Sequence, residues 1–432
     1  MTIAEQLSEL PAGFSQTNEL IAKLDSCINT GFSRLTPDQN AGLAELASAF
    51  SGSPLAEPLK EAVAAIGRSE FLVRHFCLLA TARAALQGAQ YDALQSQLGG
   101  ALGYETTEPP AVEPTGPETH ASAFSSIQQW LMEIAIGGFN NIEEAAVAPF
   151  MASLENIQAQ SQLTGLASLL TGFVNELLRY IPVDRHETLP VFRWADLWTA
   201  IMIRAQQLTP TTPGTSVDGD VVLLGTNIQG HENFVCINIY GLLKTSENTV
   251  CVRIPLNSFK VDIVRGPEVW DLFGDIGQQI LKAIENKKAI KVTKAELMAN
   301  GDLILRSKPR LGKASDPFSV ADELTPLPSL TPINRHPIHL AELVCVEGDG
   351  GFPIATDRLQ IDSEITEKVL AKAEQTIGLL RFDQGRWELQ PLAVQTEKAT
   401  VLAGDSMLKA RTKLKSKTLA ILQERSSKLL RS

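Results

Sequence analysis

Apolar residues recur at three- and four-residue spacing through the first half of the chain, which predicts amphipathic helices. One stripe runs from Ser69 to Gln87 and another from Thr164 to Tyr180. Thr36 followed by Pro37 has the form of a helix N-cap and a first helical residue. The pattern therefore predicts a helical N-terminal half.

Breaker-rich stretches divide this helical half. Residues 105–121 hold several prolines among acidic residues and threonines, with no helical period, which is typical of an extended linker. We expect a helical module over 1–104, this linker over 105–121, and a second helical module over 122–208. Within the second module, Asn140 and Asn141 are predicted to cap a helix.

The pattern of residues changes after a second predicted linker, residues 209–219. Short β-branched runs follow, and Asn300-Gly301 is a strong hairpin signal. Asp383-Gln384-Gly385 predicts a further hairpin. We also expect helices over 268–286 and 363–375. These patterns predict a mainly antiparallel α+β module over 220–395.

Two similar stretches, VCINI at 235–239 and VCVRI at 250–254, predict the two strands of one hairpin. Pairing Cys236 with Cys251 would place Cys236, Asn238, Cys251 and Arg253 on the face opposite the apolar one, because side chains alternate along a strand. We interpret the cysteines as free thiols. A redox pair or half of a metal site is the alternative, although two thiolates are too few for structural zinc.

Composition places the chain among globular proteins, since 44% of its 432 residues are hydrophobic and 20% are charged. No apolar run reaches the roughly 20 residues of a membrane-spanning helix, and the N-terminus has no basic region typical of a signal peptide. The five cysteines form no C-x-x-C pair. We therefore expect a cytoplasmic protein without a disulfide framework.

Charge is unevenly distributed, since residues 396–432 hold nine Lys or Arg and three Asp or Glu in a chain of net charge −11. The acidic remainder argues against general nucleic-acid binding, which requires a basic surface. We treat residues 396–432 as a separate basic, amphipathic C-terminal helix.

This C-terminal stretch is the most distinctive candidate for partner binding. It carries an apolar stripe with basic residues at other positions: Met407, Leu408, Leu414, Ile421, Leu422 and Leu429, with Lys409, Lys413 and Lys417. Three interpretations compete: the helix docks on its own acidic body, binds another subunit, or contacts nucleic acid or anionic lipid. It contains no aromatic residue, so base stacking is not supported.

Sequence motifs of catalysis are weak. His336 and His339 lie three residues apart, but Pro337 disfavours a helix there. The stretch VEGDGGFP, 346–353, lacks the lysine of a P-loop, and we interpret it as a tight turn with positive φ. Trp194 and Trp198 are interpreted as core packing, with a cation–π pocket as the alternative.

The sequence thus predicts a multidomain α plus α+β protein: helical modules, then a mainly antiparallel sheet module with covering helices, then an amphipathic helix. We expect a non-catalytic cytosolic scaffold or adaptor with protein subunits as partners, no cofactor and no membrane span. One alternative is an enzyme, with or without a metal, whose scattered residues include His336, His339, Asp349 and Asp357. Weak nucleic-acid binding through the C-terminal helix is another.

Overall fold

The structure is a computed structural model. It describes residues 2–104, 121–158, 160, 163–206, 214–230, 234–260, 264, 266–327, 340–359, 363–383, 385–404 and 407. Helices occupy its N-terminal half and two antiparallel sheets its C-terminal half, which confirms the predicted mixture of α and α+β structure. None of the helices in the described ranges combines the length and the apolar character needed to cross a membrane.

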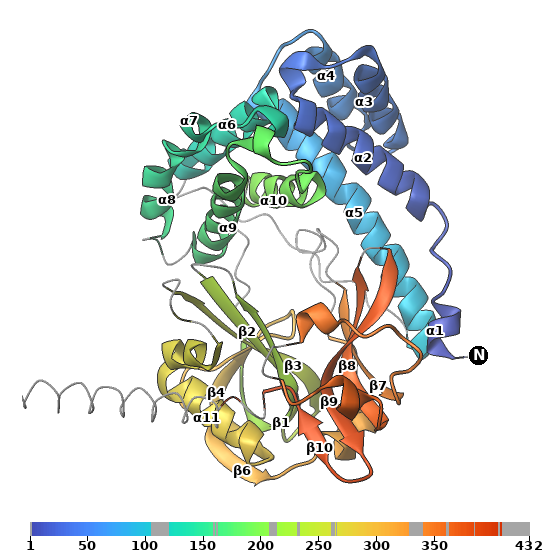
Figure 1. The fold of residues 1–432 in the computed structure, drawn as a ribbon, viewed down its shortest axis with the longest axis vertical. Helices are drawn as coiled ribbons and strands as arrows, with labels where there is room; N and C mark the ends of the chain where they lie inside the picture. Colours follow the sequence, from blue (N-terminus) through green and yellow to red (C-terminus); the bar gives the residue numbers. More distant parts are fainter. Residues whose placement is uncertain are drawn as a thin grey trace, which may run out of the picture. The chain divides into compact units, whose positions relative to one another are not determined.

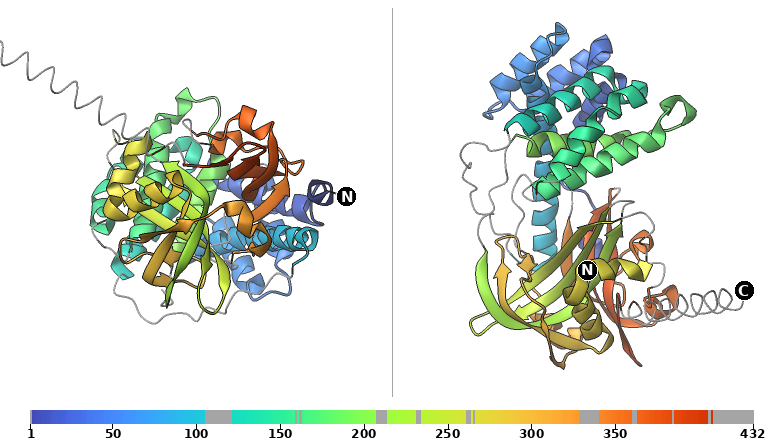
Figure 2. Two further views of the ribbon diagram at one scale, coloured as in Figure 1. Left: turned by 90° about the horizontal axis from the view of Figure 1, so that it is seen from below. Right: turned by 90° about the vertical axis from the view of Figure 1, so that its left-hand side faces the viewer.

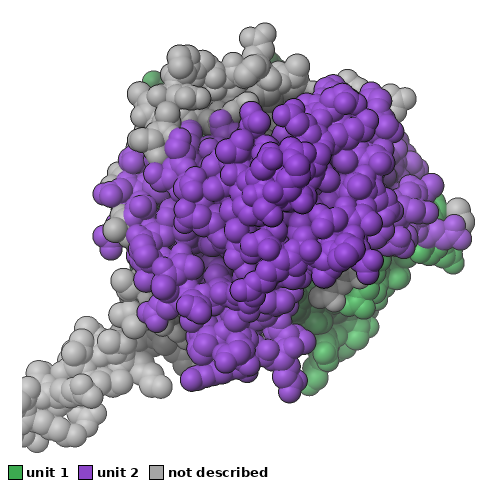
Figure 3. Space-filling view, turned by 90° about the horizontal axis from the view of Figure 1, so that it is seen from above, with its two compact units in different colours: residues 1–8, 212–329, 340–432 green, residues 9–211, 330–339 purple. Residues whose placement is uncertain are grey.

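The chain divides into two compact units (Figure 3). The helical unit comprises residues 9–211 and 330–339, and the sheet unit comprises residues 1–8, 212–329 and 340–432. Both predicted helical modules contribute to the helical unit. The exact module boundaries stay a prediction, although strand β1 begins at Thr215, inside the stretch 209–219 predicted as a linker.

The helical unit begins with four described α-helices (Figure 1), and the stripe predicted over Ser69–Gln87 falls mostly in the last of them. A capping box between Thr36 and Gln39 starts α3, with Pro37 in the first turn as the sequence predicts. The elements are α2 (Phe14–Thr30), η1 (Phe32–Arg34), α3 (Pro37–Ala49), α4 (Ala56–Gly67) and α5 (Val73–Leu102).

Five further α-helices of this unit lie in the described ranges, and α9 has the predicted bounds. The elements are α6 (Ala121–Gly137), η2 (Phe139–Asn141), α7 (Glu144–Val147), α8 (Phe150–Gln158), α9 (Thr164–Tyr180), η4 (Val183–Arg185) and α10 (Val191–Arg204). The predicted cap at Asn140 and Asn141 is wrong. Both lie in η2, and Glu143 precedes α7 without a side-chain capping bond.

These helices form two similar halves. In each half a 17-residue helix, α2 or α6, ends at a glycine of positive φ that leads into a short 3-10 helix beginning with phenylalanine. The two glycines, Gly31 and Gly138, lie back to back. A Cβ on Gly31 would lie 2.6 Å from Gly137 O, and one on Gly138 would lie 2.5 Å from Gly31 N. Only glycine fits at either position.

Contacts between elements repeat in the same way. Helix α2 contacts η2 and α10, whereas α6 contacts η1 and α5. Helix α4 packs on α5 as α9 packs on α10, and α5 crosses α10. Along these last two helices the buried positions correspond: His75, Phe76 and Leu79 on α5 match Trp194, Ala195 and Trp198 on α10. We conclude that the helical unit is internally duplicated.

The sheet unit starts with a short helix, α1 (Ile3–Gln6), and then holds sheet A and its covering elements. These are β1 (Thr215–Gly230), β2 (Phe234–Lys244), β3 (Thr249–Phe259), η5 (Gly266–Phe273), α11 (Gly274–Glu285), β4 (Lys288–Leu297), β5 (Leu303–Ile304), β6 (Arg310–Ala314) and η6 (Pro317–Glu323). The strand order is β3-β2-β1-β4-β5, with β6 also on β4. The outer strand β3 reaches β5, because Arg253 N donates to Gly301 O at 2.9 Å. Sheet A therefore nearly closes on itself.

Sheet B follows in the order β10-β9-β8-β7. Its elements are β7 (Ala341–Glu347), η8 (Thr356–Arg358), α12 (Glu367–Leu370), β8 (Ala373–Asp383), β9 (Arg386–Thr396) and β10 (Thr400–Leu402). The sheets lie against each other with β1 beside β9 (Figure 2), where Gly225 leaves room for Leu392 O. Buried residues of both sheets and of α11 form one core.

The structure confirms two predicted hairpins of this unit and differs from both of its predicted helices. Hairpins at Asn300-Gly301 and around Gly385 are confirmed, with Leu297 opposite Leu303 and Asp383 opposite Arg386. The helix predicted over 363–375 is wrong, since only α12 is helical and β8 begins inside that range. The helix predicted over 268–286 is divided into η5 and α11.

The predicted register of the 235–254 hairpin is also wrong. Cys251 lies opposite Leu242, and Cys236 lies opposite Asn257. The turn falls at Thr245–Asn248, where the Thr245 hydroxyl accepts from the backbone N–H of Glu247 and of Asn248. Six residues of β3 separate the two cysteines along the ladder, roughly 20 Å, so they form neither a redox pair nor a shared metal site. The slip is even in number, so the predicted faces survive.

Candidate functional site

Polar side chains gather on the inner face of sheet A that turns toward sheet B. Tyr240 on β2 lies opposite Arg253 on β3, and Asn238 and Cys236 continue the same face of β2. Tyr240 is buried, whereas Asn238 and Cys236 are half-buried. The face therefore becomes more open from Tyr240 toward Cys236.

Sheet B places two polar side chains against this face. Arg381 Nε on β8 donates to Gln390 Oε1 on β9 at 2.6 Å. Gln390 Nε2 in turn donates to Asn227 Oδ1 on β1 at 3.0 Å. All three residues are buried, so this chain of hydrogen bonds fixes the Arg381 side chain between the sheets.

Two further arginines of this cluster have carboxylate partners. Arg253 Nε donates to Asp302 Oδ1 at 2.6 Å, and an Arg358 terminal nitrogen donates to Asp383 Oδ2 at 2.6 Å. Arg381 makes no ion pair with any described residue. Of the three arginines, it is the one without a paired carboxylate among the described residues.

Burial shifts the protonation equilibria of the cluster. It lowers the pKa of Arg381, and the nearby Arg358 charge lowers it further, while Tyr240 and two nearby aspartates, Asp383 and Asp357, oppose the shift. Burial raises the pKa of Tyr240, against the effect of Arg381 and Arg253. Burial likewise raises the pKa of the Cys236 thiol. Neither the phenol nor the thiol is thereby activated as a nucleophile.

A second unmatched charge lies on β7. Glu342 is 5% exposed, and burial raises its pKa to about 7, although the Leu327 N–H acts to lower it. Its Oε2 atom has no partner among the described residues. The Glu342 carboxylate acts to raise the pKa of the Cys251 thiol, whose Sγ accepts a hydrogen bond from Thr325 N at 3.3 Å. Glu342 is thus a carboxyl group that titrates near neutral pH.

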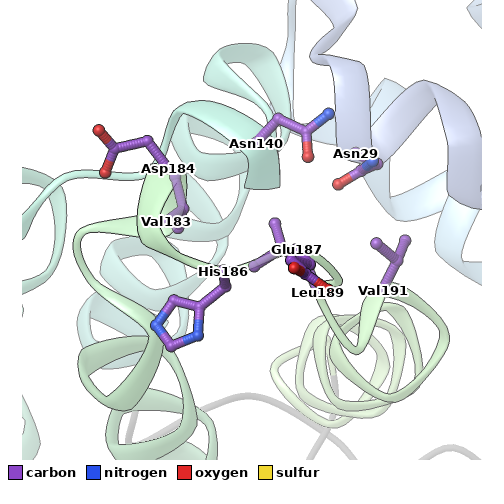
Figure 4. Close-up of a pocket in the computed structure, with 8 residues that line it drawn as sticks. All are labelled: Asn29, Asn140, Val183, Asp184, His186, Glu187, Leu189 and Val191. Atoms are coloured by element: carbon purple, nitrogen blue, oxygen red, sulfur yellow. The ribbon is translucent and has the colours of Figure 1, made fainter.

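The helical unit has a hollow of about 340 Å³. It is lined by Asn29, Asn140, Val183, Asp184, His186, Glu187, Leu189 and Val191 (Figure 4). Most of its lining comes from residues 181–190, which join α9 to α10, and Asn29 comes from α2.

The polar groups of this hollow do not converge. Asp184 and His186 point in different directions (Figure 4), and both are exposed. Asn29 Oδ1 is buried without a partner among the described residues. The hollow offers hydrogen bonds, but no acid–base pair.

The predicted site residues have different fates. Met407 is 3% exposed and belongs to the core of the sheet unit. The other residues of the predicted partner-binding stripe lie outside the described residues: Leu408, Lys409, Lys413, Leu414, Lys417, Ile421, Leu422 and Leu429. His336 and His339 of the enzyme alternative also lie outside them.

The two aspartates of the enzyme alternative do not share a site. Asp349 Oδ1 accepts from Gly351 N at 2.9 Å in a turn whose three glycines have positive φ, which confirms the predicted tight turn. Asp357 instead lies near Arg381 and acts to raise its pKa. In the described part of the chain, no three His, Cys, Asp or Glu side chains lie together as a metal ion requires.

Sequence reasoning placed Arg253, Asn238 and Cys236 on one face but missed Tyr240, Arg381 and Gln390. No local signal marks them, because the strands that carry them meet only in the folded chain. Comparisons with family models, with curated proteins and with solved structures found no match.

Proposed function

We propose that this chain is a non-catalytic adaptor that joins protein partners in the cytoplasm. The observation that supports this proposal is the position of Met407, whose side chain is held in the core of the sheet unit. The basic, apolar-striped sequence that follows therefore starts from a fixed point on the folded body. An anchored amphipathic segment is suited to recognition by a groove on a partner.

The duplicated helical unit adds a second reason. Repeated helical elements commonly provide extended surfaces for protein binding. Near the equivalent starts of α5 and α10, Leu72 is 49% exposed and Phe192 is 57% exposed. Large apolar side chains left in water at both places are consistent with a binding role.

Cross-linking and co-purification of the full chain test the proposal. Replacing Leu414, Ile421 and Leu422 by serine should abolish complexes that the unaltered chain forms, because it removes the apolar stripe. A matched variant with Lys409, Lys413 and Lys417 changed to glutamine keeps the stripe. Retention of complexes in that variant would support apolar docking. A monomer that forms no complexes would refute the adaptor function.

The polar cluster between the sheets favours a second candidate, an enzyme or small-molecule binder whose site is built from scattered residues. Buried Arg381 and Tyr240 supply the polar groups that such a site needs. This candidate predicts saturable binding of a small ligand by the sheet unit, independent of residues 408–432.

Nucleic-acid binding through the C-terminal helix stays the weaker alternative. It predicts DNA or RNA affinity that falls steeply with salt, and that disappears when residues 408–432 are removed.

A further inference from the structure

We propose that Arg381, Tyr240 and Arg358 bind a small oxyanion, a carboxylate or phosphate group, between the two sheets of the sheet unit. This site is independent of the adaptor proposal, because none of its residues belongs to the C-terminal stripe.

The first argument is charge. Arg381 is 8% exposed, and its hydrogen bond goes to the neutral amide oxygen of Gln390. Two nearby aspartates act to raise the pKa of Arg381, but neither forms an ion pair with it. A buried cation without a paired carboxylate is costly. Arg253 and Arg358, in the same cluster, each have a carboxylate at 2.6 Å. The fold thus pairs the more exposed arginines with carboxylates and leaves the more buried one without such a pair among the described residues.

The second argument is that the unsatisfied groups are donors. The two terminal nitrogens of Arg381 have no acceptor among the described residues, and neither has the Tyr240 hydroxyl. Arg358 Nε is buried without a partner in the same part of the chain. Carboxylate and phosphate oxygens accept several hydrogen bonds, and a guanidinium binds them with two parallel bonds.

The third argument is rigidity and access. Tyr240, Arg381 and Gln390 lie on paired strands, and Gln390 is held by Asn227 at 3.0 Å. An anion would therefore meet donors that are already ordered, which lowers the entropy cost of binding. The half-buried Asn238 on the same face of β2 is the more exposed end of this polar face.

Thermal unfolding and titration calorimetry of the full chain test this site. The probes are inorganic phosphate and malonate, each compared with sodium chloride at equal ionic strength. The variants are Arg381→Gln and Tyr240→Phe, with Arg310→Gln, an exposed arginine on β6, as the matched control.

We expect one of the anions to raise Tm of the unaltered chain and of the control in proportion to its concentration. Arg381→Gln should weaken affinity at least about tenfold, and Tyr240→Phe by about three- to tenfold. Phosphate giving the larger shift would identify a phosphate ligand, and malonate a carboxylate. Without anion, Arg381→Gln should melt no lower than the unaltered chain, because it removes an unmatched charge.

Three results would overturn the proposal. These are no Tm rise beyond that of chloride with either anion, an equal rise in all variants, or a large loss of Tm for Arg381→Gln without anion. The last result would show that the arginine is structural. If Arg381→Gln fails to fold, Tyr240→Phe, which lacks only a hydroxyl, decides the question. Unchanged anion binding by Tyr240→Phe would then overturn the proposal, and weakened binding would support it.

Discussion

The two units each bury an arginine, but they treat its charge in opposite ways. In the helical unit, fully buried Arg83 on α5 bonds both carboxylate oxygens of Asp25, at 2.7 and 2.9 Å, and Asp196 at 2.7 Å. In the described part of the sheet unit, the Arg381 side chain bonds the amide oxygen of Gln390 and forms no ion pair. A buried arginine is thus paired with carboxylates in one unit and left without a paired carboxylate in the other.

The difference separates buried charges that serve the fold from buried charges that remain available to a ligand or a proton. The Arg83 cluster satisfies itself, with Gln87 also donating to Asp196 at 2.7 Å, so it has no free group for a ligand. The sheet unit leaves unmatched groups of both signs, Arg381 and Glu342. Ligand binding or titration is therefore expected in the sheet unit and not around Arg83.

The duplication of the helical unit extends the comparison. By the correspondence of α2 with α6 and of α5 with α10, Met132 takes the place of Asp25 and Met202 that of Arg83. The contact between the halves shows the same exchange, because Cys77 Sγ lies 3.7 Å from Met202 Sδ and the equivalent residues are Asp196 and Arg83. Sulfur-containing side chains thus pack at positions whose equivalents hold an ion-pair cluster, so the helical fold itself does not require the charges.

The largest effect is expected from Asp25→Ala, which leaves Arg83 with half of its counter-charge. Breaking a buried pair costs about 3–5 kcal/mol, measurable as a loss of unfolding free energy in urea. Lys60→Ala is the control, since it breaks an exposed pair with Glu57 and should cost less than about 1 kcal/mol. Similar losses for both variants would contradict the structural role of the Arg83 cluster.

Glu342→Gln is expected to change the pH dependence of stability. The folded pKa of about 7 exceeds the ordinary value of 4.5, so the protonated carboxyl favours the folded state. Its contribution is complete below about pH 4.5 and is lost as pH rises through 7, by up to about 3 kcal/mol.

The glutamine variant should therefore match the unaltered chain at pH 4 and exceed its stability at pH 8.5. Denaturant unfolding at several pH values measures this, with Glu347→Gln, exposed at the end of β7, as the control. A Glu342→Gln variant that keeps the alkaline loss of stability would show that another group titrates.

Gly31→Ala tests the contact between the duplicated halves. The added Cβ meets Gly137 O at 2.6 Å at a φ of 99°, so strain and overpacking should cost about 2–3 kcal/mol. Gly88→Ala, in open space on α5, should instead stabilise by about 0.5–1 kcal/mol. Thermal unfolding distinguishes the two signs, and a stabilising Gly31→Ala would refute the close approach.

The smallest effect is expected from the triple variant Asp25→Met, Arg83→Met and Asp196→Cys, which copies the equivalent positions and leaves no carboxylate without its cation. Replacing a buried ion cluster by packed apolar residues is often neutral, so stability should change by less than about 1.5 kcal/mol. The triple variant should thus be clearly more stable than Asp25→Ala alone. A loss as large as that of Asp25→Ala would disprove the equivalence of the halves.

Periodicity in the sequence predicted the helical N-terminal half and two of the hairpins, because helical stripes and Asn-Gly turns are local signals. Helix α9 has its predicted bounds, and the Asn300-Gly301 hairpin forms. The start of β8 at Ala373 was missed, because Ser363 resembles a helix cap and favoured a helix over 363–375. Local propensity gave way there to pairing with β9, which lies later in the chain.

The sequence by itself determined which faces of its helices and strands are apolar, because a buried face needs regularly spaced apolar residues whichever element covers it. It did not determine the register of β2 and β3, because an even slip keeps every face the same and only the turn decides. Nor did it mark Tyr240, Arg358 and Arg381 as neighbours. Their proximity, and the absence of a paired carboxylate at Arg381 among the described residues, result from the packing of two sheets, which brings together residues that are far apart in the chain.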